Sequence, residues 1–252
     1  MCLVLVVWKV HPLYPCVVAA NRDEFHARPT VAADWWPDHQ QILAGRDVQA
    51  GGTWLGLTRT GRFAALTNYR DPGQRRADAP SRGALVTGLL DSGASVAESL
   101  DHLRGVGANY NGFNVIFCDG ERLGIYESVQ GSGRELGPGI YGLSNHLLDT
   151  PWPKVRHAKS RLEAALRKMP DTAPLLALLR DDRPAPDDEL PRTGVSIEWE
   201  RLLSSAFVRA GDYGTRCSTI IRIDARGRAY FDEWSWDSAG ADTAVSREFQ
   251  LE

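Results

Sequence analysis

Several signatures of common protein classes are missing from this sequence of 252 residues. Its four cysteines stand at positions 2, 16, 118 and 217, so no two have the short spacing of a zinc site. Four are also too few for a disulfide framework in a chain of this length. The histidines include no His-x-x-x-His pair, and neither a phosphate loop nor a dinucleotide fingerprint is present. We therefore expect no metal site and no nucleotide cofactor.

The net charge and the short apolar runs argue against two further classes of protein, those that bind nucleic acid and those that insert into membranes. A net charge of −3 gives no basic field to hold nucleic acid or an anionic membrane. The first apolar stretch, residues 3–8, ends at Lys9; it is too short to span a membrane, and no basic segment precedes it as in a signal peptide. We predict a cytoplasmic protein with no nucleic-acid partner and no membrane insertion. The composition leaves the oligomeric state open.

The pattern of apolar residues predicts strands and helices in separate groups. Strands are expected at 2–9, 16–21, 53–59, 62–68, 113–118, 122–130, 139–144, 217–224 and 227–233. Helices are expected at 81–92, 95–105, 154–168, 173–180 and 198–207, with irregular chain at 26–52 and 181–194. Grouped elements favour antiparallel hairpins over βαβ units. We predict one α+β domain, 1–252, of two packed sheets with helices outside.

Cys2, directly behind Met1, is the most informative residue of the chain. Methionine before a small residue is usually removed, which would leave a thiol and a free α-amine on the same residue. A free α-amine has a pKa near ~8 and a thiol near ~8.5, so the amine can accept the thiol proton at neutral pH. The alternative is that a small residue at position 2 is incidental.

The first predicted hairpin brings charged residues to Cys2. If its turn centres near residue 12 or 13, paired positions sum to about 24–26, because strand positions mirror about the turn. Cys2 then lies across from residues 22–24, Arg22-Asp23-Glu24. A one-residue change of register swaps the faces, so the side chain that points at the sulfur is left open. An aspartate facing the sulfur would hold the α-ammonium, and an arginine would favour the thiolate. The alternative is that these charged residues form a solvated turn.

Other polar residues stand where strands are predicted to end. Asn68 and Asn145 have amides that can donate to an oxyanion during acyl transfer, although asparagine is also common where strands stop. His146 is a candidate base or haem ligand, with a hydrogen-bonded surface residue as the alternative. Cys217 lies in a predicted strand and is expected to be buried and inert.

An ordered set of motifs covers essentially the whole chain. It consists of Met1-Cys2, Asn21-Arg22-Asp23-Glu24, Gly51-Gly52-Thr53-Trp54-Leu55-Gly56, Thr67-Asn68-Tyr69-Arg70, Leu143-Ser144-Asn145 and Tyr213-Gly214-Thr215-Arg216-Cys217-Ser218-Thr219. This set resembles the NRDE family, also called the transport-and-Golgi-organisation protein 2 family. That family is similar to N-terminal nucleophile hydrolases, which implies a four-layer αββα sandwich of two antiparallel sheets.

Within that fold, the chain is similar to choloylglycine hydrolases and penicillin V acylases. The resemblance implies a catalytic nucleophile at Cys2, an orienting carboxylate at Asp23, and amides at the oxyanion side at Asn68 and Asn145.

The arginines depart in part from this pattern. Those hydrolases carry an arginine three residues before the aspartate, where this chain has Ala20. Arg22, adjacent to the aspartate, is the candidate cation instead. Arg216 is matched to a late arginine of the same enzymes.

Two functions are consistent with these residues. The first is an N-terminal cysteine hydrolase or acyltransferase without a cofactor, acting on an amide or thioester of a small hydrophobic acyl substrate; an enzyme acting on C–N (amide) bonds is favoured. The second is a non-catalytic binding or carrier protein for haem or acyl-CoA, which the family's links to haem handling and acyl-CoA metabolism imply. There Cys2 would be an axial thiolate ligand. The expected partner is a small-molecule substrate or haem.

Overall fold

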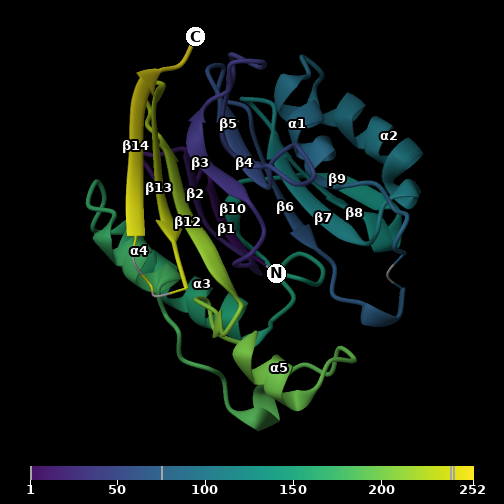
Figure 1. Ribbon diagram of the computed structural model, residues 1–252. Helices are drawn as coiled ribbons and strands as arrows, with labels where there is room; N and C mark the ends of the chain where they lie inside the picture. The colour runs from purple at the N-terminus through teal and green to yellow at the C-terminus, as the bar shows by residue number, and fades with distance from the viewer. Residues whose placement is uncertain (1, 75, 239, 241) are drawn as a thin grey trace.

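The structure is a computed structural model that describes residues 2–74, 76–238, 240 and 242–252. Two antiparallel sheets pack face to face, and helices cover their outer faces (Figure 1). This is the four-layer αββα arrangement, so the predicted fold class is confirmed. Met1 lies outside the described residues, and its removal stays a prediction.

In the described part of the chain, each sheet contains seven strands. The first has the order β10-β1-β2-β12-β13-β14, with β11 paired to β12. Its strands are β1 (Cys2–Trp8), β2 (Cys16–Phe25), β10 (Gly139–Leu143), β11 (Arg209–Ala210), β12 (Tyr213–Ile223), β13 (Arg228–Trp236) and β14 (Asp242–Gln250). The second runs in chain order: β3 (Thr30–Trp35), β4 (Ile42–Asp47), β5 (Leu55–Thr58), β6 (Phe63–Asn68), β7 (Phe113–Cys118), β8 (Leu123–Glu127) and β9 (Ser132–Leu136).

Helices lie on both outer faces. The second sheet is covered by α1 (Gly83–Asp91) and α2 (Val96–Val106), and the first by α3 (Pro153–Leu166) and α4 (Ala173–Leu179). The short α5 (Ile197–Leu202) lies beyond the end of the first sheet, near the N-terminus (Figure 1). Single 3-10 turns are η1 (Pro72–Gln74), η2 (Gly107–Asn109), η3 (Ser128–Gln130) and η4 (Asp187–Glu189).

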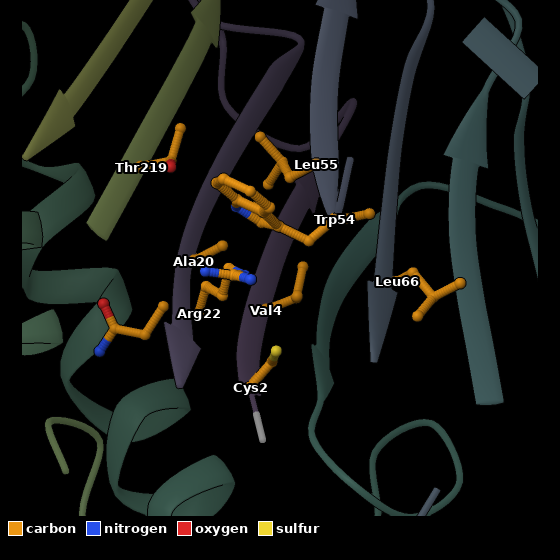
Figure 2. A pocket seen from close by; sticks show the side chains of 10 residues that line it. Cys2, Val4, Ala20, Arg22, Trp54, Leu55, Leu66 and Thr219 are labelled. Atoms are coloured by element: carbon orange, nitrogen blue, oxygen red, sulfur yellow. The ribbon is translucent and has the colours of Figure 1, made fainter. Parts of the chain in front are cut away.

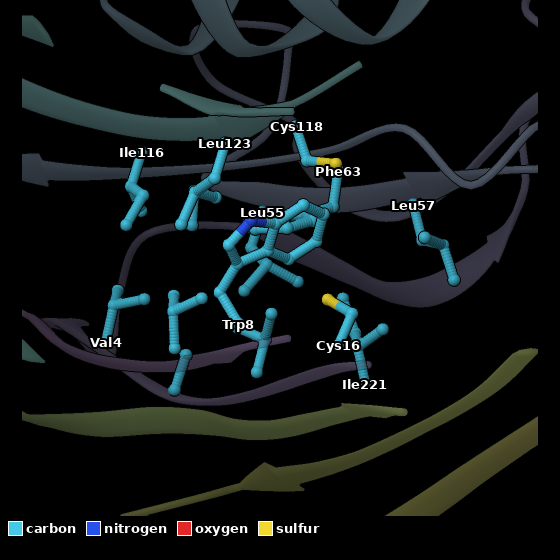
Figure 3. Packing of buried hydrophobic residues seen from close by; sticks show 14 of the residues in the cluster. Val4, Trp8, Cys16, Leu55, Leu57, Phe63, Ile116, Cys118, Leu123 and Ile221 are labelled. Atoms are coloured by element: carbon cyan, nitrogen blue, oxygen red, sulfur yellow. The ribbon is translucent and has the colours of Figure 1, made fainter. Parts of the chain in front are cut away.

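Strand alternation divides the apolar residues into layers. On β1, the even positions Val4, Val6 and Trp8 face the other sheet, whereas odd positions such as Leu3 and Leu5 pack against α3 and α4. Figure 3 shows the cluster between the sheets, to which both sheets contribute. Because β1 is buried on both faces, it reads as one continuous apolar run.

The prediction of irregular chain at 26–52 is wrong, because β3 and β4 lie there. The register of β3 shifts between Val31 and Asp34, and only Ala33 of this strand is buried, so its sequence carries no clean alternation. The predicted helix at 198–207 is shorter and ends at Leu202. The charged tetrad 21–24 lies inside β2 and is not a solvated turn.

Candidate active site

The register of the first hairpin places Arg22 directly across from Cys2. This confirms the predicted pairing, at the lower end of its range. Opposite residues of an antiparallel pair share a sheet face, and both side chains line a narrow cavity between the two sheets (Figure 2). Asp23, the next residue of β2, therefore faces the opposite way, toward α3.

The cavity at Cys2 is small and mostly apolar. Its free volume is about 10 Å³, roughly the space of one water molecule. It is lined by Cys2, Val4, Ala20, Asn21, Arg22, Trp54, Leu55, Ala65, Leu66 and Thr219. Cys2 itself is 8 % exposed. The space beside the sulfur is therefore nearly closed, and its walls are mostly apolar.

Arg22 forms one wall of this cavity. Its guanidinium lies 4.3 Å from the centroid of the Trp54 ring, and it reaches Thr30 Oγ1 at 3.1 Å and Asp47 Oδ2 at 3.5 Å. The indole lies against Gly45, where an added Cβ would approach the ring to 2.4 Å. A buried cation is thus fixed on the same face of the sheet as Cys2, two residues beyond Ala20.

Asn145 contacts the backbone of Cys2. The Cys2 nitrogen donates to Asn145 Oδ1 at 3.4 Å, and Asn145 Nδ2 donates to the backbone carbonyl of Asn68 at 2.8 Å. Ser144 Oγ donates to the Cys2 carbonyl at 2.9 Å. The structure therefore brings both predicted asparagines to the start of β1, where Asn145 is fully buried and Asn68 is half-buried.

Asp23 is buried on the helix side of the sheet. Its Oδ1 accepts a hydrogen bond from Thr215 Oγ1 at 2.7 Å, and its Oδ2 lies 4.0 Å from Lys154 Nζ. Tyr213 OH donates to its backbone carbonyl at 3.0 Å. Burial raises the pKa of the Asp23 carboxyl, and the nearby Lys154 ammonium opposes that rise.

A bulge in β12 arranges these partners. Thr215 pairs with Asp23 while Cys217 pairs with Arg22, so Arg216 is an inserted residue without a partner position on β2. Such an insertion reverses the alternation of the strand. Thr215 thereby faces the helix side with Asp23, and Cys217 faces the other sheet with Arg22. Cys217 is buried, as predicted.

The Arg216 side chain lies at the end of β2. Its Nη1 donates to the backbone carbonyls of Phe25, His26 and Arg28 at 2.8, 3.0 and 3.1 Å. The arginine thus holds the turn between β2 and β3. A role for Arg216 at the reacting atoms stays a prediction.

Two buried cations near Asp23 are absent from the sequence-based prediction. Burial lowers the pKa of Lys154 to about 8 and that of Arg70 to about 10. Arg70 Nη1 binds Glu200 Oε2 on α5 at 2.7 Å, and its backbone nitrogen donates to the Asn145 carbonyl at 2.8 Å.

The sequence does carry a signal for Lys154. It stands four and eight residues before Ala158 and Leu162, on the buried stripe of α3. A lysine in the first turn of a helix also opposes the helix dipole. A charge in this position is therefore unfavourable for the helix itself.

His146 belongs to a separate aromatic cluster. Its Nδ1 lies 2.9 Å from Thr150 Oγ1, and its ring packs between Tyr69 and Trp152. Burial lowers its pKa. Within the described ranges, no three His, Cys, Asp or Glu side chains gather in a way that could hold a metal ion. The helices of that part of the chain are also too short or too polar to cross a membrane.

A solved structure with a similar fold comes from an enzyme. The Caenorhabditis elegans N-acylethanolamine-hydrolyzing acid amidase ortholog aligns with a TM-score of 0.50 and 11% sequence identity, over 87% of this chain and 92% of that chain. At this identity the likeness establishes the fold alone, which is that of the N-terminal nucleophile hydrolases.

Sequence comparison identifies much closer relatives. The transport and Golgi organization protein 2 homolog of Bos taurus is 38% identical over 283 residues and covers 100% of both chains. The Homo sapiens homolog is 38% identical over 260 residues, covering 93% of each chain. The family model described as transport and Golgi organisation 2 matches residues 1–238. The chain therefore belongs to the transport and Golgi organisation 2 family.

Proposed function

We propose that this protein is an N-terminal cysteine hydrolase or acyltransferase that acts on the amide or thioester of a small hydrophobic acyl group. One observation carries the proposal: the Cys2 side chain lines an apolar cavity, while the Cys2 nitrogen contacts Asn145 Oδ1 at 3.4 Å. Once Met1 is removed, that nitrogen is a primary amine on the same residue as the thiol. Nucleophile and base are then held together at one end of a buried strand.

The acylation step uses this amine as the base. The amine accepts the thiol proton as the sulfur attacks the carbonyl carbon, so a C–S bond forms and the carbonyl π electrons move to the oxygen. The half-buried amide of Asn68 donates to this oxyanion, and Arg22 supplies positive charge on the cavity wall. The α-ammonium then gives its proton to the leaving amine or thiol as the C–N or C–S bond to it breaks.

Deacylation regenerates the thiol. Water attacks the acyl thioester on Cys2 and gives a proton to the α-amine. The tetrahedral intermediate collapses, the carboxylic acid leaves, and the proton returns to the sulfur. A different nucleophile in place of water gives acyl transfer. Asn145, through its Oδ1, orients the amine for each of these proton transfers.

The lining of the cavity supports an acyl group over a macrocycle. A free volume of about 10 Å³ holds neither a haem nor an acyl chain, so either ligand needs the walls to move apart, and a short acyl group needs much less movement than a haem. Its lining of Val4, Leu55, Ala65 and Leu66 matches the short aliphatic part of an acyl chain. For this reason we favour acyl chemistry over haem carriage.

The test combines intact mass with turnover. Protein from its native source should lack Met1, and incubation with acyl thioesters or acyl p-nitroanilides from acetyl to octanoyl should add one acyl mass to Cys2. Cys2→Ala should abolish both the adduct and product release. The matched control is Cys217→Ala, because Cys217 is buried on the same sheet face, across Arg22, and should keep its activity.

Two results would contradict this proposal. Quantitative retention of Met1 in protein that still turns substrate over would exclude the amine as the base. An unchanged product rate in Cys2→Ala would exclude the nucleophile itself.

A further inference from the structure

Lys154 is a buried cation that the proposed reaction does not use directly. Its side chain is 1% exposed, and Nζ has no hydrogen-bond partner among the described residues. The nearest carboxylate oxygen is Asp23 Oδ2, at 4.0 Å. Burying an ammonium without hydrogen bonds is costly, and an apolar side chain of the same length would fill this space with less penalty. The position therefore points to a role for the charge.

The charged groups around Lys154 come from several elements. Asp23 on β2 and Cys2 on β1 favour its charged form, and Arg70, which follows β6, opposes it. Arg70 is itself held by Glu200 at 2.7 Å. Asp23 is thus the anion on which Lys154 acts most strongly.

The ionisation of the Asp23 carboxyl depends on Lys154 in turn. Burial raises the pKa of this carboxyl, and the Lys154 ammonium is the strongest influence in the opposite direction. Thr215 adds a weaker, uncharged contribution through its hydrogen bond to Oδ1. Without the ammonium, the buried carboxyl would take up a proton at a higher pH.

We propose that Lys154 is a positioning residue that keeps Asp23 ionised, so that the Asp23 carboxylate stabilises the α-ammonium formed when the Cys2 thiol gives up its proton. This inference rests on the proposed function, because it needs a free amine at Cys2. Lys154 touches neither the substrate nor the sulfur. It acts on the opposite side of the sheet from the cavity.

The experiment needs no substrate. Cys2 is alkylated with iodoacetamide across a pH series, and the rate is followed by peptide mass spectrometry in protein that lacks Met1. In Lys154→Met the pH midpoint of alkylation should rise by about one unit, because the Asp23 carboxyl then takes up a proton at a higher pH and supports the α-ammonium less. The rate at pH 7 should fall about tenfold. Lys154→Arg should restore part of the rate.

The matched control lies on the same helix. Lys159 is a half-exposed lysine whose Nζ binds Asp149 at 2.7 Å. Lys159→Met removes the same charge from α3 but should leave the midpoint unchanged. Thermal unfolding of each variant verifies that it is folded, and Lys154→Gln replaces Lys154→Met if the latter does not fold.

A double-mutant cycle separates this role from a structural one. Asp23→Asn should raise the midpoint by a similar amount, and Lys154→Met in that background should raise it no further. A lysine that only fills space would lower the melting temperature without moving the midpoint.

The outcomes distinguish the two proposals. A reactive Cys2 whose midpoint is the same in wild type and Lys154→Met overturns the inference and leaves the proposed function standing. Additive upward shifts in the double variant overturn it as well. A wild-type Cys2 that is not alkylated at any pH of the series contradicts the proposed function, and the role of Lys154 with it.

Discussion

The buried ion pair between Arg70 and Glu200 provides the sharpest test of how α5 is attached to the site. Arg70 Nη1 lies 2.7 Å from Glu200 Oε2, and the two side chains are 5% and 3% exposed. Glu200 Oε1 also accepts hydrogen bonds from the nitrogen and Oγ1 of Thr193, at 2.8 and 2.6 Å. One carboxylate therefore holds both α5 and the loop before it onto the arginine that follows β6.

The expected effect of Glu200→Gln follows from these contacts. Glutamine retains an oxygen for Thr193 but turns an amide toward Arg70, so the charge-assisted hydrogen bond is lost while the shape is kept. Removing one partner of a buried ion pair costs about 3–5 kcal/mol. Because α5 is short and peripheral, it detaches before the rest of the protein unfolds. The loss of stability should therefore be at the low end of this range, about 3 kcal/mol. That corresponds to roughly a hundredfold increase in the population with α5 detached.

Native-state proteolysis of the 181–196 segment measures this population. The rate of cleavage should rise about a hundredfold in Glu200→Gln when opening is fast relative to cleavage. The adjacent pair of Arg201 and Asp187 is the control, since its side chains are 43% and 56% exposed. Asp187→Asn should leave the cleavage rate nearly unchanged, because exposed ion pairs contribute little to stability. Equal cleavage rates in the two variants would refute the argument from burial.

Further predictions concern the stability of the sheet around the site. Burial lowers the pKa of Lys154 from 10.5 to about 8, so folding favours the neutral amine. Buried Cys16 and Cys217, whose pKa values burial raises, destabilise both proteins equally over the same pH range. In urea titrations the stability of wild type relative to Lys154→Met should therefore rise by up to about 3 kcal/mol from pH 8 to 10.5. Gly52→Ala should lose more stability than Gly51→Ala, because both have positive φ (+72° and +67°) but only at Gly52 would a Cβ meet backbone, at 2.5 Å. Asn21→Leu should lower unfolding stability by about 2–4 kcal/mol, because buried Nδ2 donates to two backbone carbonyls at 2.8 and 2.7 Å.

Most central strands could be predicted from the sequence, whereas the central strand β4 and three edge strands could not. Central strands such as β1 are buried on both faces and read as unbroken apolar runs. β3, β9 and β14 each form an edge of a sheet, and much of their surface is exposed. Polar residues are tolerated there, so hydrophobic alternation is lost. Tight local signals mark other boundaries: Gly61 has φ +80° in the turn between β5 and β6, and Ser95 forms a capping box with Glu98 at the start of α2.

Only part of the site could be predicted, because its residues come from different layers. Counting along the first hairpin was enough to bring residues 22–24 to Cys2, but the facing side chain depended on a register known only to within a residue. The packing of α3 on the sheet places Lys154 against Asp23, and no local pattern encodes that contact. The insertion of Arg216 into β12 could not be predicted from the sequence either. Its bulge becomes visible only when the pairing of both neighbouring strands is known.

The alternation of β2 separates two opposite charges that are adjacent in the chain. Arg22 points into the cavity and pairs with Asp47, whereas Asp23 points to the helix side and faces Lys154. The two therefore do not neutralise each other. In the proposed reaction a proton moves from the Cys2 sulfur, on the arginine side, to the Cys2 nitrogen, at the end of the strand. A cation beside the developing thiolate and a carboxylate behind the developing ammonium both favour that transfer. A one-residue slip of β2 would exchange the two charges and oppose it.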